Sequence, residues 1–239
     1  MSRRHRLCPL LLAACVTLAA AGAGAQAATG AKEPSLPAVA KGPDWRLSVR
    51  QFAVEHLRNP AWGFSHSVRD YELARSLAAE DHVSLDDDVL YAAAYLHDIA
   101  AFAPYEKAGV DHADRAAELV GMLLAESGFP MTKIDAVRGA IRTHMFDRKP
   151  EAPEAVYLHD ADALDWLGAI GVARIFALVD PNGGAPDGPA ALKMLKDNLQ
   201  EVPPGIVSHA AHVRSGALIR ELEEFLSALG RETAAFRTL

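Results

Sequence analysis

The sequence of 239 residues is poor in cysteine and aromatic residues, and it has no excess of basic residues. Its two cysteines, Cys8 and Cys15, both lie in the first 27 residues, so a chain that loses this segment can form no disulfide. The 24 lysines and arginines are outnumbered by 31 acidic residues, which argues against a general nucleic-acid-binding protein. Half of the residues are apolar and 23% are charged, a composition typical of a globular protein.

The first 27 residues have the pattern of a secretory signal peptide. Residues 2–6 form a basic start, residues 7–21 are apolar, and Ala25-Gln26-Ala27 has the small-x-small form of a cleavage site. Cleavage there predicts a periplasmic or secreted protein with no stable membrane insertion. The alternatives are an uncleaved membrane anchor, a lipoprotein with its cleavage box at residues 12–15, and a twin-arginine signal at residues 2–4.

The rest of the sequence lacks the apolar–polar alternation of β-strands and contains no internal repeat. Residues 28–43 contain three prolines and two glycines and are predicted to be a linker. Helical periodicity with capping residues then predicts one all-α domain over residues 44–230. Its expected helices span residues 44–57, 65–80, 84 or 86–101, 111–127, 132–146, 153–179, 190–201 and 208–229.

Histidine and aspartate residues fall on the apolar faces of these predicted helices. His97 shares a face with Leu90 and Ala94, seven and three residues before it. Asp98 follows directly and shares a face with Ala94. A carboxylate buried without a partner costs several kcal/mol, and it usually becomes protonated or finds a cation. Adjacent histidine and aspartate side chains on buried faces therefore suit a metal ion.

The same placement recurs on four further predicted helices, at His66, His112, His144 and Asp162. A single histidine on an apolar stripe is commonly an ordinary core residue, so the hypothesis depends on the convergence of several helices. Without thiols, the ligands would be imidazoles and carboxylates. This donor set is typical of a catalytic divalent ion such as Mn, Fe, Co, Ni or Zn, rather than of a structural thiolate site.

The order His66, then His97-Asp98, then Asp162 on successive helices resembles the HD-domain superfamily of metal-dependent phosphohydrolases. The matching stretches are Phe-Ser-His-Ser-Val-Arg at 64–69, Tyr-Leu-His-Asp-Ile at 95–99 and Asp-Ala-Asp-Ala-Leu-Asp at 160–165. Residues 110–113 and 141–144 resemble the accessory histidine segments of some members. The resemblance covers about residues 60–175. This chain departs from many relatives in having Trp-Gly-Phe at 62–64, where they carry Gly-His-Asp.

The resemblance implies a single HD-type helical domain with a principal metal ion held by four residues: His66, His97, Asp98 and Asp162. Asp98 would bridge to a second ion held by His112 and His144, or these two histidines would contact the substrate phosphate. The centre would therefore contain one or two ions. Asp165 would steady a ligand histidine from outside the ligand set.

The activity implied by the resemblance is hydrolysis of phosphomonoester, phosphodiester or phosphoanhydride bonds in small molecules such as nucleotides, by metal-activated water. Asp98 would orient the nucleophile, and His112 or His144 would protonate the leaving group. Lys107 and Arg115, near the segment from His97 to His112, are the first candidates to stabilise the phosphate oxygens. The expected partner is thus a small phosphate ester and not a nucleic-acid polymer.

Two other functional classes remain open at this point. The ligand pattern is similar to that of di-iron oxygenases of the same superfamily, and a non-catalytic module with a structural metal is the third possibility. Among the other histidines, His159 is either a neighbour of Asp162 or an exposed helix residue. His209 and His212 share a helix face, where we expect them to be exposed.

Overall fold

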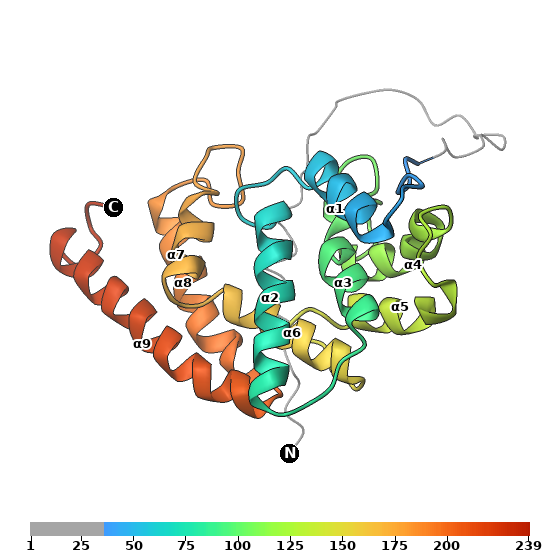
Figure 1. Ribbon diagram of the computed structural model, residues 1–239. Coiled ribbons are helices and arrows are strands. Elements are labelled where there is room, and N and C mark those ends of the chain that lie inside the picture. The colour runs from blue at the N-terminus through green and yellow to red at the C-terminus, as the bar shows by residue number, and fades with distance from the viewer. Residues whose placement is uncertain (1–35) are drawn as a thin grey trace, which may run out of the picture.

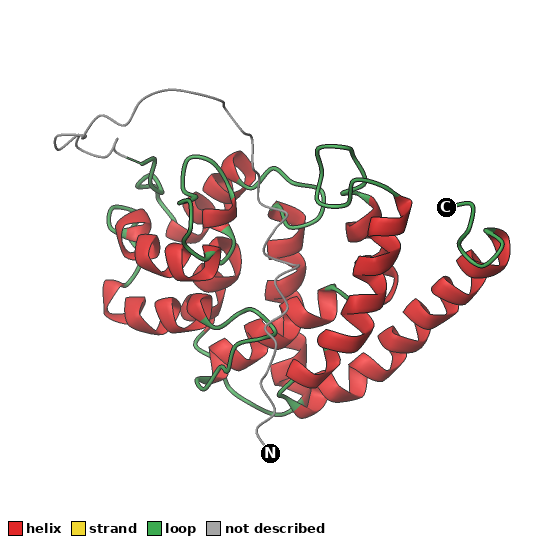
Figure 2. Ribbon diagram, turned by 180° about the vertical axis from the view of Figure 1, so that it is seen from behind, coloured by secondary structure: helices red, strands yellow, loops and turns green. Residues whose placement is uncertain are grey.

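A computed structural model describes residues 36–239, so the predicted signal peptide and the first part of the predicted linker lie outside the described residues. Within the described range the regular structure is helical and contains no strand (Figure 2). One isolated bridge joins Val179 and Ala185. The all-α prediction is therefore confirmed for this part of the chain. No helix in residues 36–239 is long and apolar enough to cross a membrane.

Nine α-helices occur in the described residues, several of them close to the predicted ranges. They are α1 (Trp45–His56), α2 (Phe64–Glu80), α3 (Asp87–Leu96), α4 (His112–Leu124), α5 (Ile134–Arg142), α6 (Pro153–Asp165), α7 (Gly168–Phe176), α8 (Gly188–Glu201) and α9 (His209–Glu232). Side chains that accept hydrogen bonds from backbone N–H groups of the first helical turn fix several starts: Asp44, Asp86, Asp111, Asp187 and Ser208.

Helix α2 stands in the middle of the molecule, with α1, α3, α4 and α5 on one side and α7, α8 and α9 on the other (Figure 1). It packs against α3 and α6, while α5 packs against α3, α4 and α6. Fully buried leucines and isoleucines from these helices form the core, among them Leu77, Leu90, Ile141 and Leu158. Each contributes about 1.5–3 kcal/mol of burial free energy. Five of the six sequence-predicted metal ligands lie where α2, α3, α5 and α6 meet, and His112 joins them from the start of α4.

The helix predicted to end at residue 101 ends instead at Leu96, and a short 3-10 helix follows at Ile99–Ala101. Between them, Asp98 leaves the helical conformation with φ −95° and ψ 6°. In a continuous α-helix, neighbouring side chains diverge by about 100°. The sequence pattern did not indicate this break. It lets His97 and Asp98 both reach the same interior region.

Two other predicted helices were too long. Helix α5 ends at Arg142, so His144 lies just beyond the helix and not on its apolar stripe. The segment predicted as one helix over 153–179 is two helices, α6 and α7, and Gly168 begins the second with a φ of +58°. This left-handed conformation favours glycine, and a Cβ there would lie 2.8 Å from the Leu218 side chain.

The structure describes residues 36–43 of the predicted linker, and part of this segment packs against the helical domain. Val39 is buried, and its N–H group donates to the Leu123 carbonyl at 3.0 Å. Tyr105 donates its hydroxyl proton to the Pro37 carbonyl at 3.1 Å. Residues 37–39 are therefore part of the packed structure.

Candidate metal centre

The structure brings the six sequence-predicted ligand residues into one region from five parts of the chain. His66 lies in the first turn of α2, His97 and Asp98 in the turn after α3, and His112 at the start of α4; His144 follows α5, and Asp162 lies in α6. Five of the six side chains are at most 9% exposed, and the sixth, His112, is 24% exposed. The centre is thus buried, and His112 is its most accessible member.

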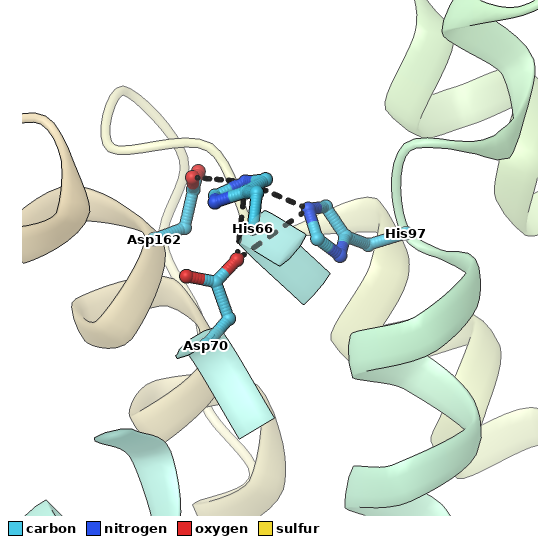
Figure 3. Close-up of side chains that lie close together, drawn as sticks. All are labelled: His66, Asp70, His97 and Asp162. Atoms are coloured by element: carbon cyan, nitrogen blue, oxygen red, sulfur yellow. Dashed lines mark hydrogen bonds and ion pairs between the residues drawn. The ribbon is translucent and has the colours of Figure 1, made fainter. Parts of the chain in front are cut away.

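One group of side chains surrounds His66, as Figure 3 shows. The Nε2 atom of His66 lies 3.2 Å from Asp162 Oδ1 and 3.3 Å from His97 Nε2. Asp70 Oδ2 lies 3.1 Å from the same nitrogen. One donor atom from each of these four residues fits within 4.8 Å of the others, so the group could hold a metal ion.

Asp98 lies between this group and two further histidines. Its Oδ2 is 3.3 Å from His97 Nε2 and 3.7 Å from His66 Nε2. Its Oδ1 is 3.4 Å from His112 Nε2 and 3.5 Å from His144 Nε2. Each carboxylate oxygen therefore faces a different pair of imidazoles. His97, Asp98 and His144 form a second group that could hold an ion.

Hydrogen bonds at the far nitrogen fix the orientation of the buried imidazoles. His97 Nδ1 lies 2.8 Å from the Ala94 carbonyl, and His144 Nδ1 lies 2.7 Å from the Ile141 carbonyl. A carbonyl oxygen can only accept, so each Nδ1 carries the proton. The neutral imidazoles then direct the Nε2 lone pair into the centre, which is the arrangement of a metal-ligating histidine.

His66 is oriented by a carboxylate, as the sequence predicted for Asp165. Asp165 Oδ2 accepts the hydrogen bond from His66 Nδ1 at 2.8 Å. Arg69 donates to both oxygens of Asp165, and the buried Arg174 donates to Oδ2 at 3.0 Å. Burial opposes ionisation of Asp165, but its bonds with Arg69 and His66 outweigh burial and lower its pKa.

The acidic and basic groups of the centre shift one another's pKa values. Burial disfavours a charge on Asp98, but the nearby imidazoles of His97, His112 and His144 hold its pKa well below the usual range. Burial lowers the pKa of His97, and the nearby Asp98 more than reverses this shift. For His144, burial prevails and the pKa is lowered. A bound divalent cation would compensate the charge of these carboxylates in place of protons on the neighbouring histidines.

Three buried polar atoms in the centre have no hydrogen-bond partner: His144 Nε2 and both carboxylate oxygens of Asp70. Such atoms normally cost about 1–3 kcal/mol each when they are left unpaired, and more when they are charged. An imidazole nitrogen and carboxylate oxygens are suitable donors for a divalent transition metal. The residues present therefore fit the metal ion that the sequence predicted.

Asp70 is a member of this centre that the sequence analysis missed. It lies four residues after His66 on α2, so the two side chains share one face of the helix. Ala74 and Leu77 continue that face and are fully buried. The signal was therefore present in the sequence as a histidine and an aspartate at helical spacing on an apolar stripe.

The structure does not bring the two predicted phosphate-binding cations into contact with the six residues. Arg115 donates to the Tyr105 carbonyl and pairs with Glu118. Lys107 is exposed in the loop before α4, and its ammonium makes no hydrogen bond or ion pair with the described residues. Arg115 is thus engaged by acceptors of the protein itself.

The remaining histidines divide into buried and exposed groups. His159 is fully buried and its Nδ1 lies 2.9 Å from Asp160 Oδ1, so the exposed interpretation of His159 was wrong. No contact joins His159 to Asp162 among the described interactions. His209 and His212 are exposed, as expected.

Residues 63–167 match the family model of the HD domain. This span begins at the residue before α2 and ends two residues after α6, and it contains all six predicted ligand residues together with Asp70 and Asp165. Residues 63–167 are an HD domain. The HD domain suggested by the order of the histidine and aspartate residues is confirmed for this span.

Solved structures of HD proteins share the fold. A predicted HD superfamily hydrolase from an uncultured Thermotogales bacterium is 28% identical, with a TM-score of 0.55 over 78% of this chain and 90% of that chain. The HD-superfamily hydrolase from Bacillus thuringiensis is 24% identical, with a TM-score of 0.51 over 72% of this chain and 86% of that chain. This chain thus has the fold of HD-superfamily hydrolases.

The Bacillus subtilis protein YpgQ, solved in complex with ADP, is 19% identical. Its TM-score is 0.60, over 78% of this chain and 97% of that chain. At this identity the likeness shows the fold alone. No curated protein matches the sequence.

Proposed function

We propose that the protein is a metal-dependent phosphohydrolase acting on small phosphorylated molecules. The observation that carries this proposal is the position of Asp98, whose two oxygens face different pairs of imidazole Nε2 atoms inside an HD domain. This arrangement is suited to a carboxylate shared by two cations. The hydrolase names of the HD-superfamily neighbours support a hydrolytic reaction.

Two ions would be held by different sets of residues. The first set is His66, His97, Asp98 and Asp162, and the second is Asp98, His112 and His144. The donor chemistry suits Mn, Fe, Co, Ni or Zn. When bound, such ions lower the pKa of water towards about 7 and polarise a phosphate oxygen.

The chain's own residues would position the substrate and move its protons. Asp98, between the two sets, would orient the attacking water. His112, at 24% exposure, is the most accessible of the six side chains, so the substrate would approach from its side and could receive a proton from it. Lys107 has an exposed ammonium that pairs with none of residues 36–239, and it remains the better candidate for a phosphate oxygen than Arg115.

We propose nucleotides as the substrate class. The structure of YpgQ in complex with ADP supports this proposal. The net charge of −7 on the whole chain is consistent with a small substrate rather than a nucleic-acid polymer. The signal-peptide pattern of residues 1–27 leads us to propose that the enzyme works in the periplasm or outside the cell, without stable insertion in a membrane.

The oxygenase alternative gains no support, because the HD-superfamily neighbours named for a reaction are hydrolases. The test is to measure phosphate release and O₂ uptake with one preparation of the protein and a panel of nucleotides and phosphate esters. We expect phosphate release that stops with a chelator and returns with a divalent metal, without O₂ uptake. Metal-dependent O₂ uptake without phosphate release would contradict the proposal, and so would indifference of the phosphate release to chelation.

A further inference from the structure

Asp70 lies wholly inside the protein, one helical turn after His66, and points into the space between His66, His97 and Asp162 (Figure 3). Its side chain is 0% exposed, and neither carboxylate oxygen has a hydrogen-bond partner. An ionised carboxylate in such a place costs several kcal/mol unless a charge compensates it. Helix α2 therefore carries a buried carboxyl group that no donor among the described residues satisfies by a hydrogen bond.

The described side chains place no lysine or arginine beside the carboxylate of Asp70. The basic groups within 4 Å of its oxygens are His66 Nε2 at 3.1 Å and His97 Nε2 at 3.7 Å. Both imidazoles use Nδ1–H elsewhere, for Asp165 and the Ala94 carbonyl, so in the neutral form their Nε2 lone pairs face the carboxylate. Lone pairs and a carboxylate repel one another, and a cation between them would turn each of these contacts into an attraction.

The nearest buried guanidinium is already engaged. Arg174 donates to Asp165 Oδ2 at 3.0 Å and to the Ala61 carbonyl at 2.7 Å. No ion pair joins Arg174 to Asp70 within 4 Å. Among the described residues, no lysine or arginine therefore forms an ion pair with Asp70.

We infer that Asp70 is a direct ligand of the metal ion held by His66, His97 and Asp162. The inference rests on the proposed metal centre and adds to it a carboxylate on the same helix face as the first histidine. The ion would then have five ligand residues. Three are carboxylates, from Asp70, Asp98 and Asp162, and two are imidazoles, from His66 and His97. Oxygen donors favour ions such as Mn²⁺ over softer ones, so this ligand set suits Mn²⁺.

The first test compares Mn²⁺ binding by the wild-type chain and the Asp70→Asn variant. We expect the dissociation constant to rise at least about 10-fold, because loss of even an outer hydrogen-bond partner costs 10–100-fold in affinity. The metal-free variant should melt at or above the wild-type temperature, because an uncompensated buried charge has been removed. Opposite effects on metal binding and on metal-free stability separate a lost ligand from a damaged fold.

Ser67 provides a matched control on the same helix. It is also fully buried, and its Oγ has no hydrogen-bond partner. The Ser67→Ala variant removes a buried oxygen three residues before Asp70, and we expect it to bind Mn²⁺ as the wild type does.

The second test places a spectroscopic reporter at the position of Asp70. A thiolate bound to Co²⁺ gives a charge-transfer band in the near ultraviolet, so the Asp70→Cys variant loaded with Co²⁺ should show this band. The Ser67→Cys variant should not show it. The wild-type chain, which has cysteines only at positions 8 and 15, supplies the baseline.

The outcomes separate this inference from the proposed function. Unchanged Mn²⁺ affinity in the Asp70→Asn variant, or absence of the band in the Asp70→Cys variant, would overturn the role of Asp70 and leave the hydrolase proposal intact. A wild-type chain that binds metal through Asp70 but releases no phosphate would support the inference and overturn the proposed activity. A wild-type chain that binds no divalent metal would overturn both.

Discussion

Asp165 accepts a hydrogen bond from Nδ1 of His66 at 2.8 Å, across 99 residues of sequence. The bond places the proton of His66 on Nδ1 and directs its Nε2 atom towards Asp162 and His97. Arg69 and Arg174 hold Asp165 in turn. The orientation of one proposed ligand thus depends on a chain of contacts that runs from α2 through α6 to α7.

Replacement of Asp165 by asparagine should weaken metal binding without removing any proposed ligand. The amide cannot match the carboxylate as an acceptor for His66 and for two arginines, so we expect the metal dissociation constant to rise about 10–100-fold. Isothermal titration with Mn²⁺ measures this. The Asp135→Asn variant is the control, because Asp135 is exposed and its one ion pair within the described part of the chain is with Arg138. Unchanged affinity in the Asp165 variant would show that His66 needs no such support.

A second prediction concerns the number of ions. His144 and His112 face one oxygen of Asp98, and His66 and His97 face the other. We expect about two equivalents of metal per wild-type chain and about one in the His144→Ala variant. Metal analysis of the purified proteins measures both numbers. A single equivalent in each protein would show that His144 serves another purpose than metal binding.

Much of the fold follows from local sequence signals. Capping residues such as Asp44, Asp111 and Ser208 mark helix starts that the structure places at the next residue. The breaks after Leu96 and Arg142 were not predictable, because apolar periodicity continues past both points. The break before Gly168 had a local signal in the glycine, but the apolar residues on either side concealed it.

The convergence of histidine and aspartate residues could be predicted from their order and from their places on apolar faces. Asp70 was missed because a single aspartate in a helix is commonly a surface residue, although its spacing of four residues from His66 placed it on the same apolar face. Lys107 and Arg115 have long, flexible side chains, and the nearby hydrogen-bond acceptors decide where their charged ends lie. Sequence proximity to His112 therefore could not decide whether either side chain reaches the centre.

The anchoring of α9 gives a prediction about stability. Asp160 is fully buried and accepts hydrogen bonds from the backbone N–H groups of Val207 and Ser208, at the start of that helix. Hydrogen bonds to charged groups contribute about 1.5–3 kcal/mol each. We expect the Asp160→Ala variant to lose about 3 kcal/mol of unfolding free energy, measured by urea denaturation, while it retains its bound metal. An unchanged free energy would show that α9 is held by packing alone.

The start of α3 gives a prediction about acid stability. Asp88 pairs with Lys133 at 2.8 Å and with Arg46 at 2.7 Å. Lys133 and then Arg46 lower the pKa of Asp88 from 3.8. A lowered folded-state pKa contributes stability that is fully present above pH 3.8 and is lost as the pH falls through the folded-state pKa.

The Asp88→Asn variant should therefore be less stable than the wild type at neutral pH, by about 1 kcal/mol or less because the pair is partly exposed. The difference should shrink as the pH falls below 3.8. Denaturant unfolding from pH 7 to pH 3 measures it. A difference that stays constant with pH would assign the effect to the N-terminal turn of α3 rather than to the ion pairs.

The most direct test of the account is to measure metal content and phosphate release together in the wild type and in the His97→Ala and Asp98→Ala variants. Both residues lie in the turn after α3, and both face imidazoles of the buried centre. We predict that each substitution removes bound metal and activity together while the helical circular-dichroism signal remains. Loss of activity with the metal fully retained would contradict the claim that these residues form the metal centre.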